Sequence, residues 1–371
     1  MSYVYLILEN GDIFRGKPFG YDGQAVGELV FSTAMTGYLE TLSDPSYYGQ
    51  IVLQTFPLVG NYGVISEDFG SGPIHLSAYI VRDWCQEPSN FRSEGSLDSF
   101  LRKNKIPGIF DVDTRKLTRI IRENGTLNAM ISKSFELSEA QWKKLSEYKI
   151  ENAIAKVAEN SAEKSALEVS ADSEGCCKDS SEASKKVSVT VWNFGAAHGL
   201  NELLSNNGFC ISKVFGHKSK ADDLISTKAD AIILTGGPGD PSENTKIIEE
   251  IKKLCGKNIP ILAVGLGHQL LAIANGAKTE KLPFGHRGAN QAVKELGTSS
   301  AFVTAQNHGY VVSEETLPKN AMMSYINVND GTCEGFEYKS IPALSVQFEP
   351  TREIFKKFKK LIEGGCSNAS K

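Results

Sequence analysis

The stretch from Ile261 to Leu271, ILAVGLGHQLL, constrains the fold more than any other part of the sequence. Its first four residues are apolar, as in a short buried strand, and the residues after Gly265 form an apolar run typical of a helix. A strand that passes through a sharp turn into a helix is the arrangement of a nucleophile elbow, which lifts a reactive side chain toward a bound carbonyl group. The residue at this turn is Gly265, which has no side chain. The sequence therefore predicts a catalytic framework that lacks its nucleophile.

The part of the chain from Val187 onward alternates between strand and helix patterns. Val187–Trp192, Ala229–Leu234 and Ile261–Val264 are short apolar strands, and Thr245–Cys255 has helical periodicity. Short buried strands that alternate with helices predict a largely parallel sheet covered on both faces. Functional groups should then lie at the carboxyl ends of the strands. Later elements are expected at Phe302–Ala305, Tyr310–Val312, Gly335–Tyr338, Ala343–Phe348 and Arg352–Glu363.

The first 150 residues have a β-rich pattern instead. Tyr3–Leu8 and Asp12–Phe14 flank an Asn-Gly pair, which favours the type I′ turn of a β-hairpin. A helix is expected to begin at Asp113-Thr114, a good N-cap, and to end at Asn124-Gly125. Further strands are expected at Glu28–Ser32, Gln50–Thr55 and Ala78–Val81.

Between these two parts the composition changes. Residues 160–186 contain no aromatic side chain and consist mainly of Ser, Glu, Lys and Ala. Such a segment cannot bury enough apolar surface to offset its ordering entropy, so it is interpreted as a flexible linker. We therefore expect an α/β protein with a β-rich domain at 1–150, a linker at 151–186 and a mostly parallel, helix-flanked domain at 187–371.

Composition limits the partners and the compartment. A formal charge of −4 and a pI near 6.0 give no electrostatic reason to expect a nucleic acid or an anionic membrane as a partner. No stretch reaches the roughly 20 apolar residues that cross a bilayer, and the N-terminus lacks the pattern of a signal peptide. The seven cysteines are scattered, and the adjacent Cys176 and Cys177 lack the spacing of a zinc site. We expect a cytoplasmic protein without a metal site.

Three loops lie at predicted strand ends, TGGPGDP (235–241), GLGHQLL (265–271) and SVQFEP (345–350). Together they resemble the loops of class I glutamine amidotransferases, which normally have Cys-Leu-Gly-His-Gln at the elbow and Phe-His-Pro-Glu after the last strand.

The N-terminal part contains FSTAMTGYLETLSDPSYYGQIV (31–52), GNYG (60–63) and GIFDVDTRKLTRIIRENG (108–125). These segments closely resemble the N-terminal domain of carbamoyl-phosphate synthetase small subunits. The segments FGHRGAN (284–290) and AQNHGY (305–310) fit the same family.

This resemblance implies a reaction and a partner. An active family member hydrolyses glutamine with a Cys, His and Glu triad and passes ammonia to a large synthetase subunit. That subunit binds ATP and bicarbonate, so no cofactor is expected in this chain. The role could belong to pyrimidine or to arginine biosynthesis.

The positions that contact glutamine in the family are largely retained. The backbone N–H of Leu266 and that of Gly237 or Gly239 would form the oxyanion hole, and Ser46 is the contact from the N-terminal domain. Tyr310 stands where the family has Phe. The complete set is Ser46, Gly237, Gly239, Leu266, Gln269, Asn307, Gly309 and Tyr310.

The positions that perform the chemistry are all replaced. Gly265 stands in place of the Cys, Glu349 in place of the His and Thr351 in place of the Glu, and Gly236 replaces an Asn of the first loop. We therefore expect a small subunit that is defective in glutamine hydrolysis. It would bind a large subunit as a structural and regulatory component of an ammonia-using complex.

Two alternatives remain open at this point. The chain could bind glutamine as a sensor without cleaving it, or it could be an active glutaminase with an unrecognised nucleophile. Cys255, some ten residues before the elbow, is interpreted as a structural cysteine. His268 and His308 are interpreted as structural residues of their loops rather than as a base or a metal ligand.

Overall fold

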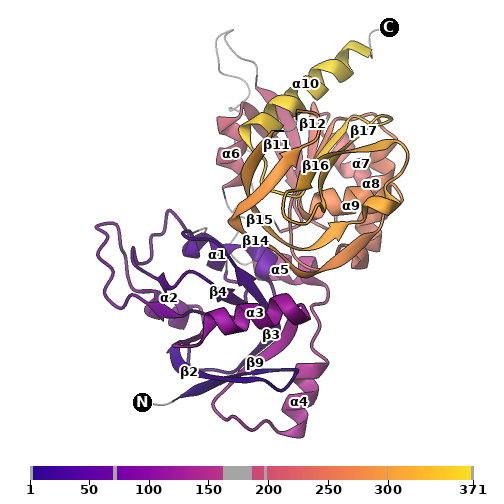
Figure 1. Ribbon diagram of the computed structural model, residues 1–371. Helices are drawn as coiled ribbons and strands as arrows, with labels where there is room; N and C mark the ends of the chain where they lie inside the picture. Colours follow the sequence, from indigo (N-terminus) through magenta and orange to yellow (C-terminus); the bar gives the residue numbers. More distant parts are fainter. Residues whose placement is uncertain (1–2, 70–72, 162–185, 196–198, 299, 369–371) are drawn as a thin grey trace. The chain divides into compact units, whose positions relative to one another are not determined.

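A computed structural model describes residues 3–69, 73–161, 186–195, 199–298 and 300–368 (Figure 1). The chain forms two compact units. Unit 1 consists of 1–153 together with 281–290 and 307–309. Unit 2 consists of 154–280, 291–306 and 310–371.

Unit 1 is built on a closed β-barrel with the strand order β1-β2-β8-β6-β4-β3-β9. The predicted β1–β2 hairpin is confirmed, with Val4 opposite Gly16. The predicted type I′ turn is wrong, because it requires a positive φ at both Asn10 and Gly11, and of the two only Gly11 has one, at φ 90°. The barrel strands are β1 (Val4–Leu8), β2 (Ile13–Gly20), β3 (Ala25–Ser32), β4 (Gln50–Gln54), β6 (Ala78–Ile80), β8 (Pro107–Phe110) and β9 (Leu127–Ser132). The remaining elements are the paired β5 (Leu58–Val59) and β7 (Asp83–Trp84), and α1 (Tyr38–Ser43), η1 (Pro45–Tyr47), α2 (Leu97–Lys103), α3 (Thr114–Asn124) and α4 (Glu139–Ser146).

Strands β4 and β6 of the barrel are buried on both faces, which explains their apolar runs, whereas β2 alternates between exposed and buried residues. In β4, Ile51 and Leu53 belong to one hydrophobic cluster while Val52 belongs to another. Such alternation is the period of two of a β-strand. Helix α3 covers the first cluster with Leu117 and Ile121. Its N-cap is Asp113, whose side chain accepts a hydrogen bond from the Lys116 N–H, so the predicted start is confirmed.

Unit 2 is built on a nine-stranded sheet with the order β11-β10-β12-β13-β18-β17-β16-β14-β15. The pairs from β11 to β18 are parallel, and β17 pairs antiparallel with β18 and with β16. The strands are β10 (Val187–Trp192), β11 (Phe209–Phe215), β12 (Ala231–Leu234), β13 (Ile261–Val264), β14 (Thr279–Glu295), β15 (Ala301–Val312), β16 (Ala321–Asn327), β17 (Cys333–Tyr338) and β18 (Ala343–Val346).

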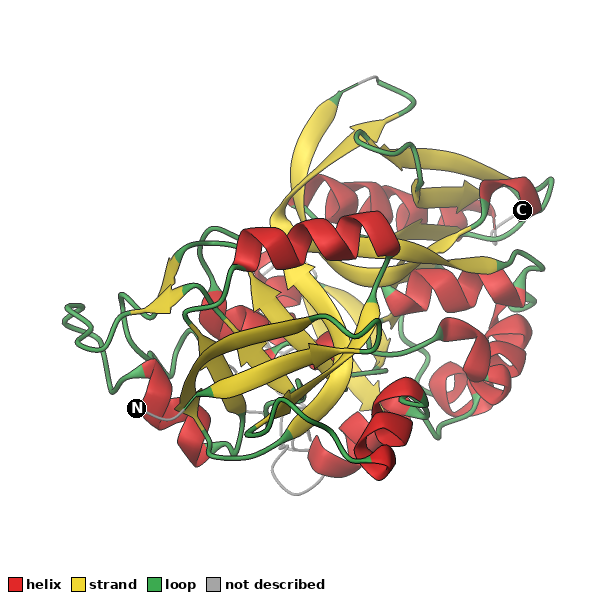
Figure 2. Cartoon of the chain, turned by 60° about the horizontal axis from the view of Figure 1, so that its bottom comes forward, coloured by secondary structure: helices red, strands yellow, loops and turns green. Residues whose placement is uncertain are grey.

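Helices lie along the strands of this sheet (Figure 2). Helix α10 packs Phe355 and Phe358 against Phe209 of β11 and the apolar side chains of β10. The helices of unit 2 are α5 (Ala153–Ser161), α6 (Leu200–Asn206), α7 (Ala221–Ser226), η3 (Pro241–Glu243), α8 (Thr245–Cys255), α9 (Leu266–Ala274), η4 (Glu314–Thr316) and α10 (Arg352–Asn368). The expected fold class, a β-rich part followed by a helix-flanked α/β part with a parallel core, is confirmed.

Two features of the chain's organisation differ from the sequence expectations. Residues 153–161 of the predicted linker form helix α5, which buries Ala153, Ile154 and Val157. The rest of that linker, including Cys176 and Cys177, lies outside the described residues. The stretches 281–290 and 307–309, expected within the second domain, belong to unit 1, because the long strands β14 and β15 each contribute a part to it.

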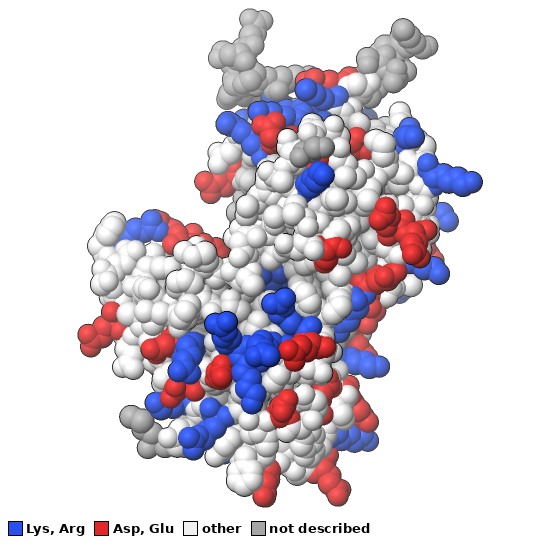
Figure 3. Space-filling view, in the orientation of Figure 1, with Lys and Arg blue, Asp and Glu red and all other residues white. Residues whose placement is uncertain are grey.

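Acidic and basic side chains are interspersed over the visible surface (Figure 3). Lys and Arg side chains gather over α3, whose exposed positions include Arg115, Arg119 and Arg122. Among the described residues, no helix is long and apolar enough to span a bilayer.

Truncation of the α10 anchor should destabilise unit 2. Phe358 is fully buried and its ring lies 5.8 Å from that of Phe209. Replacing a buried Phe by Ala costs about 3–5 kcal/mol, because transfer energy is lost and a cavity remains. We expect Phe358→Ala to lower the free energy of unfolding by this amount in urea titrations, whereas Lys356→Ala on the exposed face should change it by less than about 0.5 kcal/mol. Equal effects of the two variants would contradict the assigned packing.

Candidate functional site

The elbow has the predicted strand–turn–helix geometry. Strand β13 ends at Val264 and helix α9 begins at Leu266, with Gly265 between them at φ 54° and ψ −114°. This conformation is rare for residues with a side chain and is typical of strained turns at functional sites. The Gly265 N–H donates to the Val346 carbonyl at 2.9 Å, which anchors the turn to the neighbouring strand β18. The elbow is therefore intact although it presents no reactive atom.

The turn retains most of the space that a side chain would need. A Cβ added at Gly265 would lie 3.3 Å from the Gly236 Cα and 3.9 Å from the Gln347 carbonyl oxygen. The first distance requires a shift of only a few tenths of an ångström. The space above Gly265 is therefore largely open.

The glycine-rich loop after β12 lies beside the elbow. A Cβ added at Gly237 would lie 2.4 Å from the Phe194 carbonyl oxygen and 3.0 Å from the Leu266 Cδ2, so this position requires glycine. Leu266, predicted to supply one oxyanion-hole N–H, and Gly237, one of the two glycines predicted to supply the other, are thus neighbours. Gly239, in the same loop, has φ 89°.

Parallel pairing brings the three replaced positions to one edge of the sheet. Strands β13 and β18 pair with Val264 opposite Val346, so Gly265 and the residues after Val346 leave the sheet at the same end. Glu349 and Thr351 follow β18 directly. Glu349 is exposed, and its backbone N–H donates to the Ala305 carbonyl at 3.0 Å.

Gln269 of helix α9 joins strand β15 to the segment after β18 within unit 2. Its Nε2 donates to the Tyr310 carbonyl and to the Gln347 Oε1, both at 2.8 Å, and only 3% of the residue is exposed. Both bonds are buried or partly buried, so the amide is fixed in orientation. Gly237, Gly239, Leu266, Gln269 and Tyr310, five of the predicted binding positions, lie in unit 2.

His268 is a structural residue, as expected. Its Nδ1 lies 3.0 Å from the Ser345 Oγ, and its ring packs 4.6 Å from that of Phe336. The side chain is fully buried, and this burial lowers the pKa of His268 to about 3. It stays neutral at physiological pH and therefore serves the packing of α9 on the sheet.

The other predicted binding positions, Ser46, Asn307 and Gly309, lie in unit 1. Two of them share a partner that the sequence analysis did not single out, the carboxylate of Asp44. Its Oδ1 accepts from the Ser46 N–H at 2.8 Å and its Oδ2 accepts from the Asn307 Nδ2 at 2.5 Å. The only sequence signal for Asp44 is its place before Pro-Ser, a common helix-capping pattern.

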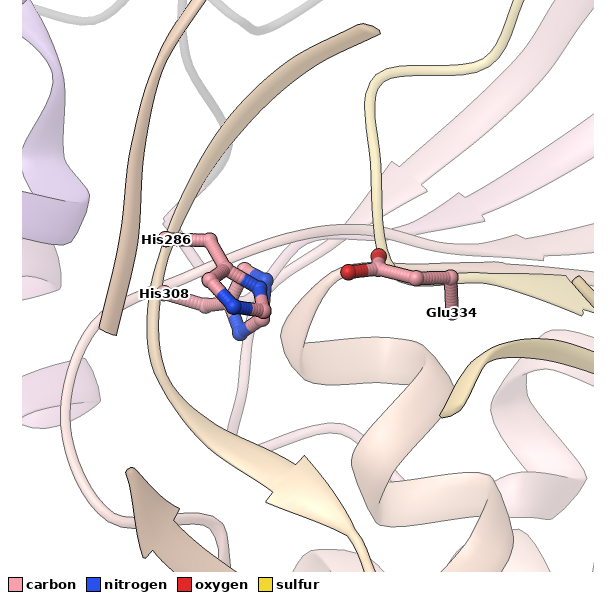
Figure 4. Close-up of side chains that lie close together, drawn as sticks. All are labelled: His286, His308 and Glu334. Carbon is pink, nitrogen blue, oxygen red and sulfur yellow. The ribbon is translucent and has the colours of Figure 1, made fainter. Parts of the chain in front are cut away.

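His308 lies beside His286 in unit 1, and both are buried (Figure 4). The two rings meet edge to face with their centroids 4.9 Å apart. Glu334, also labelled in that view, is buried in unit 2, where it accepts a hydrogen bond from the Asn327 Nδ2 at 3.1 Å. The assignment of His308 to a structural role stays a prediction.

Comparison with known protein families matches both parts of the chain. Residues 6–131 match the model of the carbamoyl-phosphate synthase small chain, CPSase domain. Residues 191–355 match the model of class-I glutamine amidotransferases. The barrel unit and the elbow sheet are thus the two modules of a two-domain amidotransferase.

Related chains match over nearly their whole length. The carbamoyl phosphate synthase small chain of Clostridium perfringens is 43% identical over 345 residues, which covers 93% of each chain. The pyrimidine-specific small chain of carbamoyl phosphate synthase from Bacillus subtilis is 40% identical over 368 residues, with 96% of this chain and 95% of the relative covered. The chain belongs to the carbamoyl phosphate synthase small chain family.

The burial of His268 predicts a pH dependence of stability. Its folded-state pKa of about 3 lies below the ordinary value of 6.5, so below pH 6.5 the unfolded chain binds a proton that the folded chain does not. This contribution weakens the fold by about 1.4 kcal/mol for each pH unit below 6.5. In urea unfolding between pH 7.5 and 5, His268→Gln should lose less stability than the wild type, and identical slopes would contradict the assignment.

Proposed function

We propose that this chain is the small subunit of a carbamoyl phosphate synthase and that it does not hydrolyse glutamine. In this proposal it binds the large subunit as a structural and regulatory component, and the large subunit uses free ammonia. ATP and bicarbonate would bind to the large subunit, so this chain needs no cofactor of its own. Such a complex would work in the cytoplasm.

The observation that carries the proposal is Gly265 at the apex of an intact elbow. Amide hydrolysis by this family's route begins with attack by a thiolate on the carbonyl carbon. Gly265 has no side chain and therefore no nucleophilic atom, so no covalent intermediate can form at this residue.

The two partner positions support the same conclusion. Glu349 carries an exposed carboxylate where the family has the imidazole, and Gly265 offers it no nucleophile to deprotonate. Thr351 carries a neutral hydroxyl where the family has the orienting carboxylate. In subtilisin, removal of the whole triad lowers turnover by about 10⁶-fold, with the oxyanion hole supplying the residual rate.

Cys255 is poorly suited to replace the nucleophile. It ends helix α8 and precedes β13, whereas the elbow follows β13, so the strand separates them. Burial raises the pKa of the Cys255 thiol, and its Sγ lies 3.5 Å from the Asn275 Nδ2. A protonated thiol at the opposite end of the strand supports a packing role.

A second function, glutamine binding without cleavage, is favoured by the fixed contacts of the residues predicted to bind glutamine. The Gln269 amide is fixed by two hydrogen bonds, and Gly237 is packed against Leu266. In unit 1, Ser46 and Asn307 are both held by Asp44. A surface that no longer bound anything would have no need of these contacts, so glutamine occupancy is a candidate signal to the partner.

The nitrogen donor used by the complex tests the main proposal. The chain is mixed with the large subunit of the same organism, ATP and bicarbonate, and supplied with either glutamine or ammonium chloride. We expect carbamoyl phosphate with ammonium chloride and no synthesis above background with glutamine. Synthesis at comparable rates from the two donors would refute the proposal.

Restoration of the replaced side chains should create glutamine hydrolysis. The elbow is intact and an added Cβ meets only Gly236 closely, so the triple variant Gly265→Cys, Glu349→His, Thr351→Glu should fold. We expect glutamate release at least about 10²-fold above the wild type, since nucleophile and base together contribute several orders of magnitude. The double variant Glu349→His, Thr351→Glu is the matched control and should stay at background, because it has no nucleophile.

A further inference from the structure

In unit 1, Asp44 makes a long-range hydrogen bond in addition to the one by which it caps helix η1. Asp44 and Asn307 lie 263 positions apart in the sequence, and the Asn307 Nδ2 donates to the Asp44 Oδ2 at 2.5 Å. The other carboxylate oxygen, Oδ1, accepts from the Ser46 N–H at 2.8 Å and caps the short helix η1. One carboxylate therefore joins the short helix η1, which carries Ser46, to strand β15, which carries Asn307.

The same chain provides an internal comparison. The tripeptide Asp-Pro-Ser occurs at 44–46 and again at 240–242. The Asp240 Oδ1 accepts from the Ser242 N–H at 2.8 Å and caps η3 in the same way. Since Oδ1 alone makes this cap, the bond from the Asp44 Oδ2 to Asn307 is an addition to the local motif.

Burial raises the pKa of the Asp44 carboxyl above its ordinary value, although the hydrogen bonds from Asn307 and Ser46 and the positive charge of Arg287 act in the opposite direction. Arg287 is only 3% exposed, and its charge also faces Glu28 and Tyr47. A buried guanidinium stays protonated, so it stabilises a carboxylate nearby.

Arg287 also lies against the third predicted binding position of unit 1. A Cβ added at Gly309 would lie 3.0 Å from the Arg287 Nη2, and the Arg287 Nη1 donates to the Phe284 carbonyl at 2.8 Å. The Arg287 carbonyl in turn accepts from the Thr33 N–H at 3.0 Å. Asp44 and Arg287 thus support Ser46, Asn307 and Gly309 as one group.

Both oxygens of the Asp44 side chain accept hydrogen bonds, Oδ1 from the Ser46 N–H and Oδ2 from the Asn307 Nδ2. This contact decides the orientation of the Asn307 amide. Its nitrogen faces Asp44, and its oxygen is the end directed away from Asp44.

We propose that Asp44 is a positioning residue that fixes the Asn307 amide with its oxygen toward a ligand. The amide oxygen would then select a hydrogen-bond donor, such as the ammonium or amide group of a free amino acid. The proposal rests on the glutamine-binding function described above for the identity of the ligand. The positioning itself rests on the contacts within unit 1.

Two substitutions of Asp44 separate positioning from amide orientation. Asp44→Ala removes both acceptors. Asp44→Asn can keep η1 joined to β15, because its carboxamide can donate to the Asn307 oxygen once the Asn307 amide has flipped by 180°. The turned amide would present nitrogen to the ligand. Asp240→Ala is the matched control, since it removes an equivalent cap without the long-range bond.

Hydrogen exchange of the full-length chain, followed by mass spectrometry, tests the positioning. We expect Asp44→Ala to speed exchange in peptides that cover 305–310 about tenfold, the scale of one lost hydrogen bond to a charged group. Asp44→Asn should stay within about threefold of the wild type, and Asp240→Ala should leave these peptides unchanged. Unchanged exchange in Asp44→Ala would overturn the positioning role. If Asp44→Ala fails to fold, Asp44→Asn decides the positioning role. That role would be overturned if Asp44→Asn exchanged tenfold faster than the wild type in peptides 305–310 and still bound glutamine with unchanged affinity.

Calorimetric titration with glutamine tests the amide orientation. We expect Asp44→Asn to weaken binding at least tenfold while its exchange stays near that of the wild type. Equal affinity of Asp44→Asn and the wild type would overturn the orientation argument. No heat with millimolar glutamine in the wild type would reject both the glutamine-binding function and the ligand part of this proposal, whereas the exchange series would still decide the positioning part.

Discussion

Parallel pairing of β13 with β18 is the constraint on which the arrangement of unit 2 depends. Because both strands run in the same direction, the elbow after Val264 and the loop after Val346 must leave the sheet at one edge. The Gly265 N–H bond to the Val346 carbonyl extends this pairing by one residue into the turn. The same edge receives the glycine-rich loop that follows β12, since β12 is also parallel to β13. The meeting of these loops at one edge is thus a product of backbone topology and does not depend on which side chains the loops carry.

The sequence predicted best those elements whose patterns are local. The limits of β10, α8 and β13 were predicted to the residue, because a short apolar run between turn residues or a helical stripe suffices to define them. Helix α5 was missed, since its buried side chains occupy a single turn at the border of a polar segment. The strands β14 and β16 were missed as well, because their mixed composition shows a strand only once a neighbouring strand is present.

The candidate site likewise has residues that a local sequence pattern reveals and residues that only the fold brings together. The elbow and its replaced residues could be found from sequence because strand, turn and helix are contiguous. Asp44 could not, because its capping pattern recurs at Asp240, and only the fold brings Asn307 to one of the two. The part played by Arg287 likewise depends on burial, which the glycine-rich segment around it does not reveal.

The division of the chain into units has a consequence for how such a protein can change over evolutionary time. Stretches 281–290 and 307–309, encoded in the amidotransferase half, are structural parts of the barrel unit. A deletion of the second half would remove those stretches and leave the first unit incomplete, so neither half of the sequence specifies its own unit alone. Single substitutions in the amidotransferase half leave these shared stretches in place, whereas removal of that half does not.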